Sequence, residues 1–139
     1  MKSTSELLND IKSAESIQKF LSENEEDLYN PQLKSHLQRL LKEKKVNKMQ
    51  VIRRGALSEN YAYQIFSGVK SPSRDKVIQL AVGFGLNLEE TSYLLKIAGL
   101  GELYPRTRRD AILIYCIEHK LTIMQINDLM YDLNEYIFQ

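Results

Sequence analysis

Apolar residues recur every three or four positions along most of the chain, and this spacing restricts the fold more than any other feature. Such a period places one apolar stripe on each helix, whereas a strand needs strict alternation. Glycines and prolines separate the stretches, and Pro31, Pro72 and Pro105 each precede a helical pattern, where the missing N–H costs little. The spacing predicts an all-α protein of about seven helices with short connections.

The predicted helices can be placed along the chain by their apolar faces. We expect helices over about residues 4–22 and near 33–41, 47–54, 58–67, 77–84, 91–98 and 123–133. Residues 111–117 admit a strand by composition, but their flanks favour a helix. Pairs of side chains that can form capping boxes support these helix starts: Ser3 with Glu6, Asn47 with Gln50, Asn87 with Glu90, and Thr122 with Gln125.

Composition excludes several classes of protein. One Cys in 139 residues rules out a disulfide framework and a cysteine-ligated zinc site, and two His cannot build a His-rich site. We therefore expect no metal and no cofactor. The longest apolar run, residues 111–117, is shorter than the roughly 20 residues of a membrane helix. The first residues lack the apolar core of a signal peptide, so we expect a cytoplasmic protein with no membrane partner.

No catalytic motif stands out, and we expect that the chain is not an enzyme. Cys116 and His119 share a helix face, but no third group orients them, so a buried thiol and a partly exposed imidazole are favoured over a catalytic pair. His36 lies among basic residues and is expected at the surface. Asp75 and Asp110 each follow an Arg and are expected to complement helix starts.

Charge is distributed unevenly, although 19 Lys and Arg nearly balance 18 Asp and Glu. Residues 1–30 hold three lysines and seven acids, and residues 121–139 carry a net charge of −3. Between them, residues 34–54 hold eight basic residues and one acid, a net charge of +7. A basic stretch on consecutive short helices suits a phosphate backbone, whereas a solvated helix face is the simpler interpretation of any single basic run.

Residues 47–68, NKMQVIRRGALSENYAYQIFSG, place two short helical patterns around a tight turn. Asn47 can cap the first helix, which is expected to end near Arg54. Ser58 can cap the second helix, which is expected to stop at Gly68. Two short helices across such a turn form a helix-turn-helix, whose second helix can lie in the major groove of DNA.

Over about residues 32–99 the sequence resembles the Xre/Cro-type, λ-repressor-like DNA-binding domain. The resemblance rests on features in a fixed order: Ala56-Leu57-Ser58 in the turn, Gly68 followed by VKSPSRDK, and Gly85-Leu86-Asn87 before Leu88-Glu89-Glu90. Two departures stand out. Lys48 stands where the family usually has Gln. Ile52 stands where the family usually has Ala, and Ala62 stands where it usually has a larger aliphatic residue. A core tolerates such a pair of changes when its total volume is kept.

The segments YQIFSG, PSRDKVIQLA and LYPRTRRDAILIY also look like a subgroup of Xre-type regulators from Gram-positive bacteria. The resemblance implies a λ-repressor-like helix-turn-helix domain of about five helices over residues 31–101. It adds an N-terminal helix, in an acidic arm over residues 1–30, and two C-terminal helices. The latter form an extension over residues 102–139 that packs on the domain.

The resemblance also implies which residues meet DNA. Side chains expected to read bases from helix 58–67 are Glu59, Asn60, Tyr63 and Gln64. Asn and Gln side chains can form two hydrogen bonds with adenine, and a Glu carboxylate can accept one from the amino group of cytosine. For Glu59 the simpler alternative is that an acid in the first turn complements the helix dipole. Residues expected to contact phosphate are Lys48, Ser58, Tyr61, Lys70, Ser71 and Arg74. Tyr61 has the alternative of packing on the preceding helix.

These features together predict a sequence-specific transcriptional regulator that binds double-stranded DNA. The alternative is a protein–protein adaptor, or an antitoxin-like protein, that retains the fold; Lys48, Glu59 and the net charge of +1 favour the adaptor. The extension carries five aromatic residues: Tyr104, Tyr115, Tyr131, Tyr136 and Phe138. They complete the core, form a homodimer interface or dock a protein partner.

Overall fold

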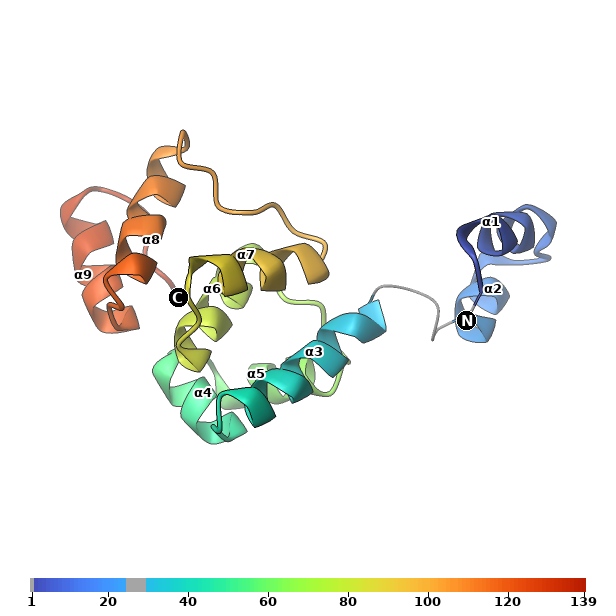
Figure 1. Ribbon diagram of the computed structural model, residues 1–139, viewed down its shortest axis with the longest axis horizontal. Coiled ribbons are helices and arrows are strands. Elements are labelled where there is room, and N and C mark those ends of the chain that lie inside the picture. Colours follow the sequence, from blue (N-terminus) through green and yellow to red (C-terminus); the bar gives the residue numbers. More distant parts are fainter. Residues whose placement is uncertain (1, 25–29) are drawn as a thin grey trace.

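A computed structural model describes residues 2–24 and 30–139, and within them the chain forms nine helices and no strand (Figure 1). The all-α prediction is confirmed. The helices are α1 (Thr4–Ser13), α2 (Ile17–Glu23), α3 (Asn30–Glu43), α4 (Lys48–Arg54), α5 (Glu59–Phe66), α6 (Arg74–Phe84), α7 (Leu88–Ile97), α8 (Arg108–Glu118) and α9 (Ile123–Asp132).

The single helix expected over residues 4–22 is wrong, because the chain forms α1 and α2 there. Ala14 adopts an extended backbone with ψ 138°, which ends α1. The hydroxyl of Ser16 then accepts the N–H of Lys19 at 3.2 Å and starts α2. A local cap thus overrides a continuous apolar period. Residues 111–117 lie within the helix α8, as their flanks predicted.

Reciprocal caps fix three of the four helix starts for which the sequence predicts them, whereas at α1 Ser3 accepts the N–H of Glu6 without the return bond. In each of the three, a side chain accepts the N–H of the third helical residue, whose own side chain accepts the N–H of the cap. The pairs are Asn47 with Gln50 on α4, Asn87 with Glu90 on α7, and Thr122 with Gln125 on α9. Ser58 caps α5 through its side chain, so the start of this helix is also confirmed.

Helices α4 and α6 approach each other at backbone distance. A Cβ added to Gly83 of α6 would lie 2.4 Å from the carbonyl oxygen of Val51. A Cβ added to Gly55, at the end of α4, would lie 2.7 Å from the carbonyl oxygen of Gln79. Such approaches are closer than any side-chain carbon tolerates, so both positions require glycine.

The turn after α4 is held by a buried amide from α6. The side chain of Gln79 is 1% exposed, and its Nε2 donates to the carbonyl oxygens of Gly55 at 3.0 Å and Ala56 at 3.4 Å. Ala56 adopts a left-handed backbone with φ 52°, a conformation that costs a non-glycine residue about 1 kcal/mol. The contacts from Gln79 therefore stabilise a strained turn and set the direction in which α5 leaves it.

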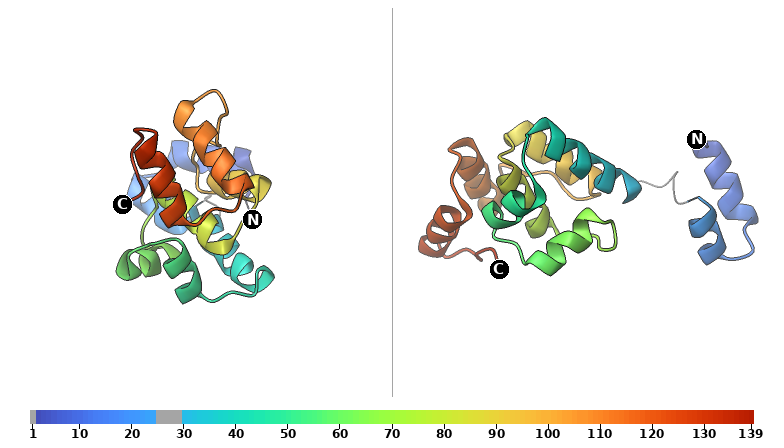
Figure 2. Two further views of the ribbon diagram at one scale, coloured as in Figure 1. Left: turned by 90° about the vertical axis from the view of Figure 1, so that its left-hand side faces the viewer. Right: turned by 90° about the horizontal axis from the view of Figure 1, so that it is seen from below.

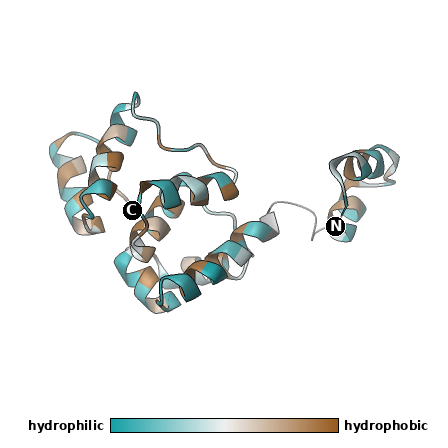
Figure 3. Cartoon of the chain, viewed as in Figure 1, coloured by the Kyte–Doolittle hydropathy of each residue, from teal (hydrophilic) through white to brown (hydrophobic). Residues whose placement is uncertain are grey.

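One apolar core runs through α3–α7 and continues into α8 and α9. Ile52 and Ala62 both lie in this core, as an exchange of volume between them requires. Helix α8 packs beside α7 and α9 (Figures 1 and 2). The last two helices, α8 and α9, contribute the buried residues Leu113, Cys116, Ile117, Ile123, Ile126 and Met130. Hydrophobic and hydrophilic residues alternate along these helices (Figure 3), as amphipathic helices require.

Replacing Gly83 by Ala tests whether the α4–α6 approach carries the fold. We expect Gly83→Ala to lower the free energy of unfolding by about 2 kcal/mol, because overpacking outweighs the roughly 1 kcal/mol by which Ala favours a helix. Gly101→Ala is the matched control, since a Cβ there meets nothing within 4 Å. Urea unfolding followed by circular dichroism measures both. A Gly83→Ala variant as stable as Gly101→Ala would contradict the close approach.

Candidate nucleic-acid interface

The four residues expected to read bases share the exposed side of α5. They are Glu59, Asn60, Tyr63 and Gln64, whereas Ala62, Ile65 and Phe66 are buried on the other side. This division follows from the helical period, which places residues three and four positions apart on one face. The structure therefore brings all four predicted side chains together on a surface open to solvent.

Two of the predicted phosphate ligands lie over aromatic rings of α5. The Nζ of Lys48 is 5.7 Å from the ring centroid of Phe66, and the Nζ of Lys70 is 5.7 Å from that of Tyr61. Each ring can hold its ammonium group near α5 through a cation–π contact. Tyr61 itself is half-buried against the core, which is the packing role left open by the sequence.

Ser58 and Ser71 are exposed, one at the start of α5 and the other in the loop that follows this helix. A third lysine, Lys34, was not predicted as a ligand. Lys34, Gly68, Lys70 and Ser71 line one small cavity between α3 and the loop after α5. Sequence reasoning counted Lys34 only within the basic stretch, because its place beside Lys70 arises from tertiary packing of α3 on α5.

The charge of +7 over residues 34–54 is partly neutralised. Arg39 pairs with Glu43 at 3.5 Å, and Lys44 pairs with Glu90 of α7 at 2.6 Å. The exposed His36 expected from the sequence is wrong, since this residue is 8% exposed and packs edge-on against the ring of Tyr93. Burial, with the nearby Arg39, lowers the pKa of His36, so its imidazole adds no charge at neutral pH.

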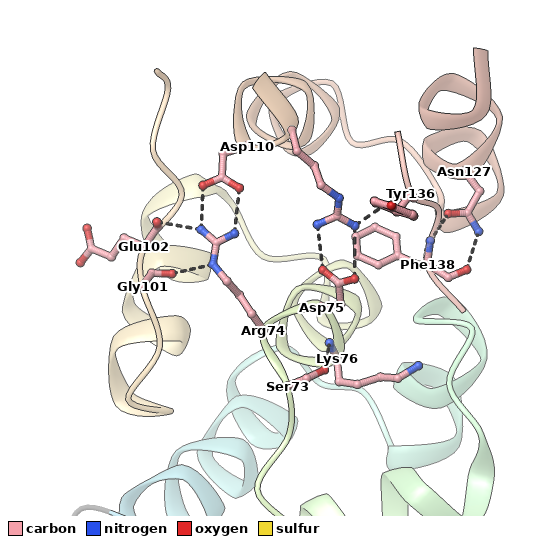
Figure 4. Close-up of polar contacts among 11 residues, drawn as sticks. Ser73, Arg74, Asp75, Lys76, Gly101, Glu102, Asp110, Asn127, Tyr136 and Phe138 are labelled. Atoms are coloured by element: carbon pink, nitrogen blue, oxygen red, sulfur yellow. Dashed lines mark hydrogen bonds and ion pairs between the residues drawn. The ribbon is translucent and has the colours of Figure 1, made fainter. Parts of the chain in front are cut away.

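Arg74 has partners other than the phosphate expected from the sequence. Its Nη1 and Nη2 donate to the two carboxylate oxygens of Asp110, each at 2.8 Å. Its Nε donates to the carbonyl oxygen of Gly101 at 3.0 Å, and Nη2 also donates to that of Glu102 at 2.8 Å (Figure 4). The guanidinium is thus bound to the extension, and Arg74 is left out of the phosphate-binding set proposed below.

A second ion pair lies beside the first. Arg109, beside Asp110 on α8, donates to both carboxylate oxygens of Asp75, at 2.8 and 3.2 Å (Figure 4). The dipeptides Arg74-Asp75 and Arg109-Asp110 therefore exchange partners between the starts of α6 and α8. Both aspartates lie in first helical turns, as the sequence predicts, but the exchange between them was not foreseen. In the sequence, the only indication of these ion pairs is that an Arg-Asp dipeptide occurs at two predicted helix starts.

Asp110 depends on these contacts because its carboxylate is buried. The residue is 4% exposed, and the backbone N–H of Tyr104 donates to it at 3.0 Å. The hydrogen bonds from Arg74, assisted by that from Tyr104, lower the pKa of Asp110 despite its burial. The same bond with Asp110 raises the pKa of Arg74. Both groups therefore remain charged over the whole physiological range.

Cys116 and His119 take the places expected of them. Cys116 is buried, which raises the pKa of its thiol and keeps it protonated at neutral pH. His119 is exposed and stacks on Tyr115 with ring centroids 4.0 Å apart. Over residues 2–24 and 30–139, no three His, Cys, Asp or Glu side chains are grouped so that they could hold a metal ion.

Within the part of the chain that the structure describes, no helix has the length and apolar character needed to cross a membrane. Comparisons with protein-family models, curated proteins and solved structures found no match for this chain. The resemblance to λ-repressor-like domains therefore rests on the sequence motifs alone.

The acid stability of the chain tests the buried Asp110 contact. Because the pKa of Asp110 is lower in the folded chain than in the unfolded chain, its stabilisation is present above about pH 4 and is lost as the pH falls further. We expect Asp110→Asn to cost about 2 kcal/mol of unfolding free energy at pH 7 and progressively less below pH 4. A cost that stays constant from pH 7 to pH 3 would contradict the ionised contact.

Proposed function

We propose that this chain is a sequence-specific DNA-binding transcriptional regulator that inserts α5 into the major groove. One observation carries the proposal: the exposed side of α5 presents Glu59, Asn60, Tyr63 and Gln64, while its other side is anchored in the core. A helix fixed on one side and lined with amide and phenol groups on the other can read base edges. The close approach of α4 and α6, with the bonds from Gln79 to the turn, holds α5 in a fixed direction.

Phosphate contacts come from the borders of this face. Lys48, at the start of α4, lies over Phe66 of α5, and Lys70, in the loop after α5, lies over Tyr61, so both ammonium groups are held close to this helix. We add Lys34 to the predicted set because it lies beside Lys70 and Ser71. Such contacts supply affinity that does not depend on sequence, whereas Asn60 and Gln64 supply discrimination.

The second candidate is a protein–protein adaptor, or an antitoxin-like protein, built on the same scaffold. Two observations favour it: Glu59 opens the exposed face of α5, and Lys44 and Arg39 pair with acids rather than remaining free. A carboxylate near phosphates costs affinity unless it meets a base donor. The two candidates differ in how binding to DNA responds to salt.

Titration with a random 20-base-pair duplex at several salt concentrations separates the two. A DNA-binding protein should lose affinity as salt rises, with a log–log slope near −0.9 for each phosphate contact. An adaptor should show little affinity at low salt and almost no slope. The first result is expected here, and the second would reject DNA binding.

Substitutions then divide the interface into two kinds of contact. On a duplex selected from a random pool, Gln64→Ala and Asn60→Ala should each cost roughly 1–3 kcal/mol, with a smaller loss on random duplex. Lys70→Ala should weaken both duplexes alike and reduce the salt slope by about one unit. Lys120→Ala is the matched control, because this exposed lysine lies between α8 and α9. Equal losses on both duplexes for Gln64→Ala would exclude base reading by that residue.

A further inference from the structure

The end of the extension displays two tyrosines that the core does not use. Tyr131 is 77% exposed on the last turn of α9, and Tyr136 is 86% exposed in the segment that follows. Both line an open cleft, together with Asp132, Asn134 and Glu135. Single exposed aromatic residues are ordinary on a protein surface, whereas two that line one cleft are typical of a binding site.

The segment that carries Tyr136 is fixed to the fold by several side chains. The carbonyl oxygen of Tyr136 accepts from Arg109 at 3.3 Å. Asn127 bonds both the N–H and the carbonyl oxygen of Phe138, whose ring is buried beneath the guanidinium of Arg109 (Figure 4). The backbone that carries Tyr136 is therefore held in place, so it has little freedom left to lose on binding.

Of the two acids that line this cleft, only Asp132 is unpaired within the part of the chain that the structure describes. Residues 121–139 contain no Lys or Arg and three acids. Arg108 pairs with Glu135, which leaves Asp132 without a hydrogen-bond or ion-pair partner among the described residues. Asp132 is also the last residue of α9, where the helix dipole disfavours an anion. Its carboxylate thus lies free at a position where it weakens the isolated fold.

We propose that this cleft binds an arginine or lysine side chain from a segment of a partner protein. The cation would lie against the rings of Tyr131 and Tyr136, since aromatic faces attract a positive charge. The carboxylate of Asp132 would accept its N–H groups, and the ordinary cost of an acid at a helix end would be offset in the complex. This interaction is independent of DNA binding by α5.

Charge selects this occupant over two others. A second copy meeting the cleft through the same surface would bring its own unpaired Asp132 carboxylate towards the first, and the two repel. DNA is repelled in the same way. A basic segment with apolar neighbours meets the carboxylate of Asp132, and it also meets Met124, which is 76% exposed seven residues before Tyr131 and so on the same side of α9.

Nuclear magnetic resonance of the full chain, titrated with a heptapeptide, tests the proposal. The probe is acetyl-GLRGLRG-amide, and the matched probe, acetyl-GLEGLEG-amide, replaces arginine by glutamate. We expect the arginine peptide to shift amide signals of residues 128–137 with a millimolar or lower Kd, and the glutamate peptide to shift none of them. Tyr131→Ala and Asp132→Asn should each raise the Kd at least fivefold.

Two controls separate binding from folding. Tyr115→Ala removes another half-exposed tyrosine, on α8, and should leave the Kd unchanged. Asp132→Asn should be at least as stable as the parent chain in urea, because it removes an unfavourable charge from the end of α9. A Kd that is the same in Asp132→Asn, or equal for the two peptides, would overturn the proposal. Self-association that Tyr131→Ala abolishes would instead assign the cleft to a second copy.

Discussion

The backbone contact between α4 and α6 is the constraint on which the rest of the structure depends. Glycine at positions 55 and 83 lets the two helices approach until carbonyl oxygens fill the space of a side chain. This approach brings the amide of Gln79 to the two carbonyls of the turn, which holds Ala56 in its left-handed conformation. The turn in turn sets the direction of α5, and so decides which of its residues face solvent.

A second constraint joins the extension to the α3–α7 body. The two Arg-Asp dipeptides exchange ion pairs between α6 and α8, while the apolar core continues beneath them into α8 and α9. The exchange also anchors the start of α6, which directly follows the loop of Lys70 and Ser71. The extension therefore takes part in holding one border of the proposed DNA interface, and it presents the tyrosine cleft from a rigid base.

Local chemistry explains which features could be predicted. Helix starts follow from short-range signals, so the caps at Asn47, Asn87 and Thr122 were expected correctly, as was the exposed face of α5. Tertiary contacts leave no such signal. Arg74 was expected to contact phosphate, but its guanidinium is bound to the buried carboxylate of Asp110 on α8. His36 was expected at the surface because its sequence neighbours are basic, but the ring of Tyr93 packs against it. The break between α1 and α2 escaped notice because the apolar period continues across it.

Hydrogen–deuterium exchange with and without a random duplex tests most directly whether α5 and its borders meet DNA. Measured at low salt by mass spectrometry, exchange should slow in peptides covering residues 58–71 and stay unchanged over residues 121–139. Residues 121–139 are acidic and lie on another helix, so their exchange rate serves as the reference for exchange in residues 58–71. Binding that leaves residues 58–71 unprotected, or that protects the extension alone, would contradict recognition through α5.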